Sequence, residues 1–163
     1  MKKLNIAIVA HDARKHELTE WCKHNVDVLS THNLYATGTT GRIIEDINAV
    51  WKTDTEDNTF YKDGPLIGKV NCLLSGPLGG DQQIGAMIAE GKIDVLIFFC
   101  DNLITQGHQQ DVGALVRLAS LYNIAFATNR TTADMIITSP LCADDTYERI
   151  VPDVINRYIN RTL

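Results

Sequence analysis

Short apolar runs and longer amphipathic stretches alternate along the whole chain. Leu4–Ala10 and Val95–Phe99 are almost entirely apolar and rich in branched and aromatic side chains, which is typical of strands buried on both faces. The pattern predicts five strands, at Leu4–Ala10, Asn33–Ala36, Val70–Leu74, Val95–Phe99 and Ile124–Ala127. Between them, apolar residues spaced by three and four predict helices over Lys15–Leu29, Gly41–Val50, Gln82–Glu90, Asp111–Tyr122 and Thr132–Thr138.

This alternation of strands and helices predicts a single fold class. Parallel strands need crossover connections, which are right-handed and place helices on both faces of the sheet. We therefore expect one three-layer, doubly wound α/β domain with a five-stranded parallel sheet, spanning residues 1–163. A last helix is expected from Pro152, with its apolar residues packing back on the domain.

One stretch, at about 51–69, interrupts the alternation of predicted strands and helices. It is polar and charged, carries turn signals at Gly64-Pro65 and Gly68, and is interrupted by Phe60 and Tyr61. We interpret it as an inserted, ordered excursion. A solvated flap of no catalytic importance is the alternative.

Composition narrows the classes of function. The chain has a net charge of −5 and no basic run, which argues against nucleic-acid and anionic-membrane partners. Its four cysteines are widely spaced, so free thiols in a reducing compartment are expected rather than a zinc or redox motif. The first residues are too poor in apolar side chains for a secretory signal, and no stretch approaches the roughly 18 apolar residues of a membrane span. We expect a cytoplasmic protein.

Polar and glycine residues gather where four of the predicted strands end. The carboxyl ends of parallel strands form the crevice in which open α/β sheets bind their ligands. The clusters are therefore expected to converge on one pocket. They are His11-Asp12, Thr37–Gly41, Ser75–Asp81, and Asp101 with His108 and Asp111.

The Thr37–Gly41 cluster, TGTTG, lies between a predicted strand and a predicted helix. Small residues allow the backbone to approach a ligand, hydroxyls donate hydrogen bonds, and a helix N-terminus favours negative charge. These features suit a phosphate monoester, although the motif is neither a Walker loop nor G-x-G-x-x-G. A plain helix cap and turn is the alternative.

The Ser75–Asp81 cluster, SGPLGGD, also joins a strand to a helix. Asp81 is either the N-cap of the helix beginning at Gln82 or a carboxylate aimed over the sheet edge by the tight turn at Gly79 and Gly80.

The remaining two clusters combine histidines with charged residues. His11 is either a satisfied structural residue or a ligand contact, and Asp12 is either a helix cap or part of the site. Lys15 in a first helical turn is unfavourable to the helix dipole, which is a reason to look for an anion beside it. His108 among carboxylates would be held in one tautomer and become a donor to a substrate oxygen, unless Asp101 and Asp111 are only turn residues. No H-x-x-H or H-E-x-x-H spacing supports a metal site.

These residues carry a resemblance to the methylglyoxal synthase family that extends almost from end to end. The matching stretches are IAIVAHD at residues 6–12 with Lys15, LYATGTTG at 34–41, LSGPLGGDQQ at 74–83 and IDVLIFF at 93–99, followed by Asp101, His108, Asp111 and ATN at 127–129. The chain departs from the family pattern in the stretch at 51–69, in Asn102 where a proline is common, and in Gln109-Gln110.

The resemblance implies a lyase that converts dihydroxyacetone phosphate to methylglyoxal and inorganic phosphate, without a metal or an organic cofactor. It implies Asp81 as the catalytic base and His11 and His108 as substrate contacts, with Asp12, Asp101 and Asp111 as acidic residues near the site. The substrate and phosphate site would be lined by Lys15, Thr37, Gly38, Thr39, Thr40, Ser75 and Gly76. It also suggests a homo-oligomer, specifically a hexamer.

The chemistry agrees with the residue types. Removal of a proton next to a carbonyl needs a base and a stabiliser of the enediolate oxygen, and an aspartate becomes a better base when it is desolvated or near other carboxylates. The alternative function is a non-catalytic phosphate-ligand or nucleotide-sensing domain of the same fold. Such a domain needs the phosphate loop but not Asp81 together with His108.

Overall fold

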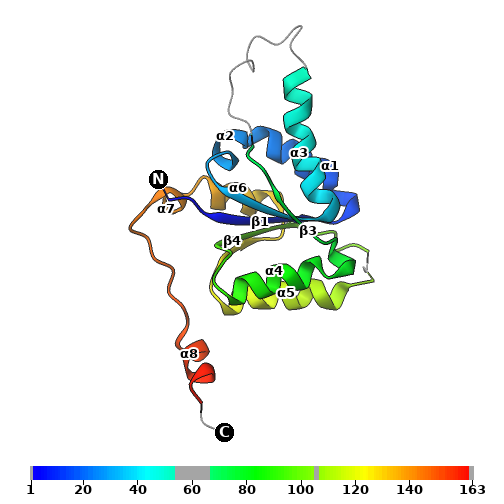
Figure 1. The fold of residues 1–163 in the computed structure, drawn as a ribbon. Helices are drawn as coiled ribbons and strands as arrows, with labels where there is room; N and C mark the ends of the chain where they lie inside the picture. Colours follow the sequence, from blue (N-terminus) through cyan, green and yellow to red (C-terminus); the bar gives the residue numbers. More distant parts are fainter. Residues whose placement is uncertain (1, 54–66, 105–106, 162–163) are drawn as a thin grey trace.

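The structure is a computed structural model that describes residues 2–53, 67–104 and 107–161. Its centre is a five-stranded, all-parallel sheet, as the sequence predicted (Figure 1). The strands are β1 (Asn5–Ala10), β2 (Asn33–Thr37), β3 (Asn71–Leu73), β4 (Val95–Phe99) and β5 (Ala125–Ala127), in the order β3-β2-β1-β4-β5.

Helices cover both faces of this sheet and complete three layers (Figure 1). One face carries α1 (Lys15–His24), α2 (Val26–Leu29), α3 (Gly38–Thr53) and α6 (Arg130–Ile137), and α7 (Pro140–Ala143) follows α6. The other face carries α4 (Gly80–Ala89) and α5 (Gln109–Leu121). Two 3-10 turns, η1 (Asp12–Arg14) and η2 (Gly76–Leu78), follow β1 and β3, and the chain ends with α8 (Asp153–Ile159).

The strand pattern explains the two helical layers. Alternate residues of β1 enter opposite cores: Ile6 and Ile8 pack with α1, α3 and α6, whereas Ala7 and Val9 pack with α4 and α5. Both sets are at most 3% exposed. A strand that is apolar on both faces is therefore stable only between two helical layers.

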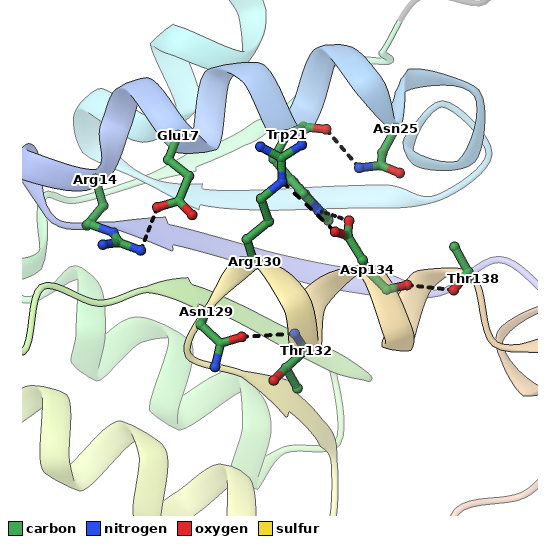
Figure 2. Close-up of polar contacts among 9 residues, drawn as sticks. All are labelled: Arg14, Glu17, Trp21, Asn25, Asn129, Arg130, Thr132, Asp134 and Thr138. Carbon is green, nitrogen blue, oxygen red and sulfur yellow. Dashed lines mark hydrogen bonds and ion pairs between the residues drawn. The ribbon is translucent and has the colours of Figure 1, made fainter.

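A partly buried polar contact joins α1 to α6. The fully buried Trp21 donates its indole N–H to Asp134 Oδ1 at 2.7 Å, and Arg130 Nε lies 3.9 Å from Asp134 Oδ2 (Figure 2). Asn129 caps α6 by accepting the N–H of Thr132. This contact holds α1, whose first turn reaches the carboxyl edge of the sheet.

Several boundaries differ from those predicted. The helix expected over Lys15–Leu29 is interrupted at Asn25, whose side-chain amide donates to Trp21 O. The helix expected from Gly41 begins at Gly38, so most of the TGTTG cluster is the first turn of α3 and not a separate loop. The helices expected from Gln82, Asp111 and Thr132 each begin two residues earlier than expected.

The expectation that the last helix packs back on the domain is wrong for most of its apolar side chains. Only Ile155 is buried, whereas Tyr158 is 64% and Ile159 is 74% exposed. Residues 144–152 cross the amino edge of the sheet before α8 begins, held by bonds from Lys2 to Tyr147 O and from Asn123 to Ile150 O. This path leaves α8 beyond the sheet, beside the end of α5 (Figure 1).

The predicted insertion at about 51–69 lies mostly outside the described residues, since 54–66 are not among them. Where the chain is described again, Ile67 and Val70 are buried in the core on the α1 side. In residues 2–53, 67–104 and 107–161, no helix has the length and apolar character needed to cross a membrane.

Candidate functional site

A cavity of about 610 Å³ opens at the carboxyl edge of the sheet, beside the ends of β1 and β4. These two strands are neighbours, and the chain winds away from them in opposite directions, which is the arrangement that opens a binding crevice in doubly wound folds. Most residues predicted for the site line this cavity: His11, Asp12, Lys15, Thr37, Thr39, Thr40, Ser75, Gly76, Asp81, His108 and Asp111.

A carboxylate and an imidazole form the pair at the base of this cavity. Asp81 Oδ2 lies 2.9 Å from His108 Nδ1, and the side chain of Asp81 is 1% exposed. Its other oxygen, Oδ1, is buried and has no hydrogen-bond partner among the described residues. One carboxylate oxygen is therefore oriented by His108, while the other keeps its lone pairs available.

The local chain explains the position of Asp81. The residue before α4 is Gly79, in the left-handed region at φ 106°, and Asp81 does not cap the helix as one reading of the sequence proposed. A Cβ at Gly80 would lie 2.0 Å from Leu74 O, so only glycine allows α4 to begin this close to β3. A Cβ at Gly76 would come within 3.1 Å of both oxygens of Asp81, so the backbone there approaches the carboxylate directly.

His11 lines the cavity, and a backbone hydrogen bond defines its tautomer. Its Nδ1 accepts the backbone N–H of Asp101 at 2.9 Å, so a neutral ring must carry its proton on Nε2. Burial lowers the pKa of His11, and the nearby His108 lowers it further, against the opposing charges of Asp81 and Asp101. His11 Nε2 is buried without a hydrogen-bond partner within the described part of the chain, so the neutral ring has an Nε2–H that none of the described groups accepts.

The two imidazoles lie close together. Their ring centroids are 5.7 Å apart and the planes are perpendicular. The other neighbour of His11 is Phe98 of β4, edge-on at 5.0 Å. Phe98 also lines the cavity, and sequence reasoning missed it because an apolar side chain in a buried strand has the signature of core alone.

On the other side of the cavity, Lys15 bridges α1 and α3. Its ammonium donates to Thr39 Oγ1 at 2.6 Å and forms an ion pair with Asp12, whose carboxyl pKa is lowered by that bond. Asp12 is the anion that Lys15 was expected to have beside it, and its side chain is 94% exposed. The ammonium is therefore held at the N-terminal turn of α3.

The glycine of this turn is required by close packing. Gly38 has a φ of 25°, its N–H donates to Leu74 O at 3.2 Å, and a Cβ on it would lie 2.3 Å from Ser75 Oγ. Thr37 and Thr40 are buried beside it. The turn after β2 and the turn after β3 thus form one continuous wall, with hydroxyl groups and a helix N-terminus facing an ammonium.

The two remaining acidic residues act in different ways. Asp111 lines the cavity from the first turn of α5. Asp101 is not among the lining residues: its backbone N–H holds His11, and its Oδ1 accepts the N–H of Leu103. Asp101 therefore shapes the loop after β4 and orients His11.

The arrangement combines three chemical capacities in one cavity. Asp81 Oδ1 can accept a proton, His11 Nε2 can donate to a developing oxyanion, and Lys15 with the first turn of α3 can hold an anionic group. No group of three or more His, Cys, Asp or Glu side chains in the described ranges has an arrangement that could hold a metal ion.

Comparison with known proteins identifies the family. The model of the MGS-like domain family matches residues 17–128. The methylglyoxal synthase of Maridesulfovibrio salexigens is 52% identical over 139 residues, covering 85% of each chain, and that of Proteus mirabilis is 48% identical over 149 residues, covering 91% of this chain and 86% of the relative. The crystal structure of methylglyoxal synthase from Elizabethkingia anophelis superposes with a TM-score of 0.79 at 38% identity, over 99% of this chain and 93% of the other.

Proposed function

This chain belongs to the methylglyoxal synthase family and is a lyase, and we propose that its carboxyl-edge cavity converts dihydroxyacetone phosphate to methylglyoxal and inorganic phosphate. The observation that carries the proposal is that a buried carboxylate oxygen, Asp81 Oδ1, and a buried imidazole nitrogen, His11 Nε2, both lack a hydrogen-bond partner among the described residues. Proton abstraction next to a carbonyl needs this combination of base and oxyanion donor.

In the first step, Asp81 Oδ1 takes a proton from the carbon that bears the substrate hydroxyl. The electron pair of that C–H bond forms a carbon–carbon double bond, and the carbonyl oxygen becomes the enediolate oxygen. His108 keeps the carboxylate in position through Oδ2. Because Asp81 is buried, no bulk water competes for its free oxygen.

His11 stabilises the enediolate oxygen through Nε2–H. A neutral imidazole has a proton to donate at every pH above its own lowered pKa, and it adds no positive charge that would repel Lys15. The backbone N–H of Asp101 secures this tautomer, because a ring nitrogen that accepts a hydrogen bond carries no proton.

In the second step, the enediolate expels phosphate. The hydroxyl group next to the enediolate oxygen gives its proton to the departing phosphate and becomes the aldehyde carbonyl. The double bond shifts to the carbon that carried the phosphate as the C–O bond breaks and its electrons leave with the phosphate. The resulting enolate takes up, at that carbon, the proton that Asp81 removed, and becomes methylglyoxal. Lys15, Thr39, Thr40 and the N-terminus of α3 stabilise the charge that grows on the leaving group, with Ser75 and Gly76 on the adjoining wall.

Elimination competes with isomerisation, in which the neighbouring carbon would be protonated and phosphate retained. We call Lys15, Thr39, Thr40, Ser75 and Gly76 together the anion wall. We propose that this wall holds the bridging C–O bond out of the enediolate plane, where the bond overlaps the π system and can break. A bound enediolate analogue with its phosphate bridge in the plane would contradict this part of the proposal.

Two wider features belong to the same proposal. We expect a homo-oligomer, a hexamer by family resemblance; the exposed Leu74, Leu78 and Leu103 at the carboxyl edge of the sheet suit coverage by another copy. Static light scattering measures the assembly directly. A cytoplasmic location agrees with the four cysteines, all of which are free thiols.

The deciding experiment incubates the full chain with dihydroxyacetone phosphate, traps any dicarbonyl with a hydrazine and measures released phosphate. Equal amounts of trapped methylglyoxal and phosphate are expected. Triose isomerisation without phosphate release would contradict the proposed second step. Phosphate binding without any product would instead indicate a ligand-sensing domain of this fold.

A further inference from the structure

A second cavity, of about 290 Å³, lies at the amino edge of the sheet, opposite the carboxyl-edge site. Its floor is formed where three strands begin, by Leu4 before β1, Val95 of β4 and Ala125 of β5. Its other walls come from α6, α7 and the segment that crosses this edge after α7 (Figure 1). None of its lining residues takes part in the reaction proposed above.

The walls are mostly apolar. Ile136 and Cys142 line the inner side, and Met135, Leu141 and Tyr147 form the rim, where they are 69%, 50% and 45% exposed. Binding sites for small molecules have this character, with predominantly apolar walls and a few placed polar groups, and this volume is at the lower end of their range. The cavity therefore fits a compact molecule with an apolar part.

Two cations at this cavity donate hydrogen bonds to backbone carbonyls. Arg149 donates from one terminal nitrogen to Ile93 O at a long 3.4 Å, and Lys2 donates to Tyr147 O at 2.9 Å. Among the residues that the structure describes, neither side chain forms an ion pair. The carboxylate of Asp94, which also lines the cavity, accepts the backbone N–H of Asn5.

Arg149 also leaves a donor without an acceptor. Its Nε is buried and has no hydrogen-bond partner in the described part of the chain. A buried N–H without an acceptor is unfavourable, and a guanidinium meets this need best with a carboxylate that binds two of its N–H groups at once. The cavity thus combines apolar walls with a buried guanidinium N–H that lacks an acceptor among the described residues, which an anionic oxygen could supply.

We propose that this amino-edge cavity binds a small carboxylate that carries an apolar ring or chain. The carboxylate accepts hydrogen bonds from Arg149, and the apolar part lies against Ile136 and Leu141. A phosphate monoester fits poorly here, because it is strongly hydrated and most of the wall surface is apolar. The proposal is independent of the reaction proposed for the carboxyl-edge site.

The test uses 3-phenylpropionate as the probe and 3-phenylpropanol as its uncharged match, each added to the full chain in its native assembly. Saturation-transfer NMR gives the dissociation constants. We expect the carboxylate to bind roughly tenfold more tightly than the alcohol, because the hydrogen bond to a charged partner is lost in the alcohol. We also expect saturating inorganic phosphate to leave the binding unchanged, since phosphate is held at the opposite edge.

Variants assign the binding to this cavity. Arg149→Met should weaken binding of 3-phenylpropionate roughly tenfold, to the level of the alcohol. Arg157→Met, which removes an exposed arginine of α8 outside the cavity, is the matched control and should bind as the parent does. Ala125→Phe adds bulk at an exposed edge-strand position that lines the cavity, and should reduce the binding of both probes.

Retained turnover and an unchanged thermal midpoint show that each variant is folded. Should Arg149→Met lose its fold, Ala125→Phe carries the same test. Equal binding of the acid and the alcohol, full binding by Arg149→Met, displacement by inorganic phosphate, or no binding of the acid at millimolar concentration would each overturn the proposal. Turnover of dihydroxyacetone phosphate is measured separately, so the two proposals fail independently.

Discussion

Two buried histidines at opposite edges of the sheet accept the same kind of hydrogen bond and have different roles. His11 accepts the N–H of Asp101 and His32 accepts the N–H of Leu4, in both cases through Nδ1. They are 6% and 7% exposed, and burial is the largest cause of a lowered pKa in each. Burial and a backbone donor therefore favour the neutral form of both histidines and do not distinguish one from the other.

The surroundings of the second ring nitrogen make the difference. His11 faces His108, Asp81 and Asp101 beside a cavity, whereas the charged residue that acts on His32 is Lys3. Around His32, neighbouring polar groups pair with one another: Asn33 donates to Asn5, and Asn5 donates from its backbone to Asp94. At the carboxyl edge, Asp81 Oδ1 and His11 Nε2 have no partner within the described ranges, so they are available to a substrate.

The largest expected difference between the two edges of the sheet is the effect of replacing Asp81. Asp81→Asn removes the base while keeping the shape, and turnover should fall by roughly 10²–10⁴-fold, the usual contribution of a positioned base. Affinity for inorganic phosphate should stay within a few-fold, because the anion wall is untouched. Asp94→Asn is the matched change at the amino edge and should leave turnover unaltered. Steady-state kinetics measure the loss of turnover, and a phosphate titration measures the affinity. Full activity in Asp81→Asn would show that Asp81 is not the base.

Replacing each histidine in a separate variant tests whether His11 and His32 differ in their effect on turnover. His11→Gln loses the Nε2–H donor to the enediolate, and kcat should drop by roughly 10²–10³-fold, as for removal of an oxyanion donor. His32→Asn should keep kcat, because its ring accepts a hydrogen bond from the backbone of Leu4 at the edge of the sheet opposite the proposed site. Steady-state assays of both variants under one set of conditions make the comparison. Similar losses of kcat in the two variants would mean that His11 acts through the fold and not on the substrate.

Lys15 tests the anion wall. Lys15→Met should weaken binding of inorganic phosphate and of substrate by roughly 10–100-fold, because a hydrogen bond to a charged group changes the dissociation constant by about that factor. Lys23→Met removes an exposed lysine of the same helix that pairs with Glu20, and should bind phosphate normally. Isothermal titration with phosphate gives both affinities. Unchanged phosphate affinity in Lys15→Met would remove the ammonium from this role.

The smallest expected effect is a dependence of stability on pH. His11 and His32 have pKa values below the 6.5 of the unfolded chain, so the unfolded state binds more protons in this range. Their contribution to stability is fully present above pH 6.5 and is lost as pH falls through the lowered pKa values. Urea unfolding at pH 7.5 and 5.5 should therefore show a decrease, and His32→Asn should show a smaller one. If the free energy of unfolding of His32→Asn falls by as much as that of the parent between pH 7.5 and 5.5, His32 does not contribute to the pH dependence.

The fold and the place of the site followed from local pattern. Apolar runs such as Val95–Phe99 predicted buried parallel strands, and the polar residues after each run predicted where a pocket opens. The same pattern misjudged details that depend on distant partners. The start of α3 at Gly38 requires Ser75 and Leu74 alongside, and the exposed position of α8 follows from the path of the chain across the amino edge.

The sequence by itself determined the strands, the helical faces and the residue types at the carboxyl edge, because each of these depends on neighbours within a few positions. Tertiary structure decided which oxygen of Asp81 is free, which nitrogen of His11 carries the proton, and that Asp101 acts through its backbone. It also decided that Arg149 meets the start of three strands in a second cavity. Hydrogen bonds between residues 90 and even 145 positions apart exist only once packing has brought their atoms together.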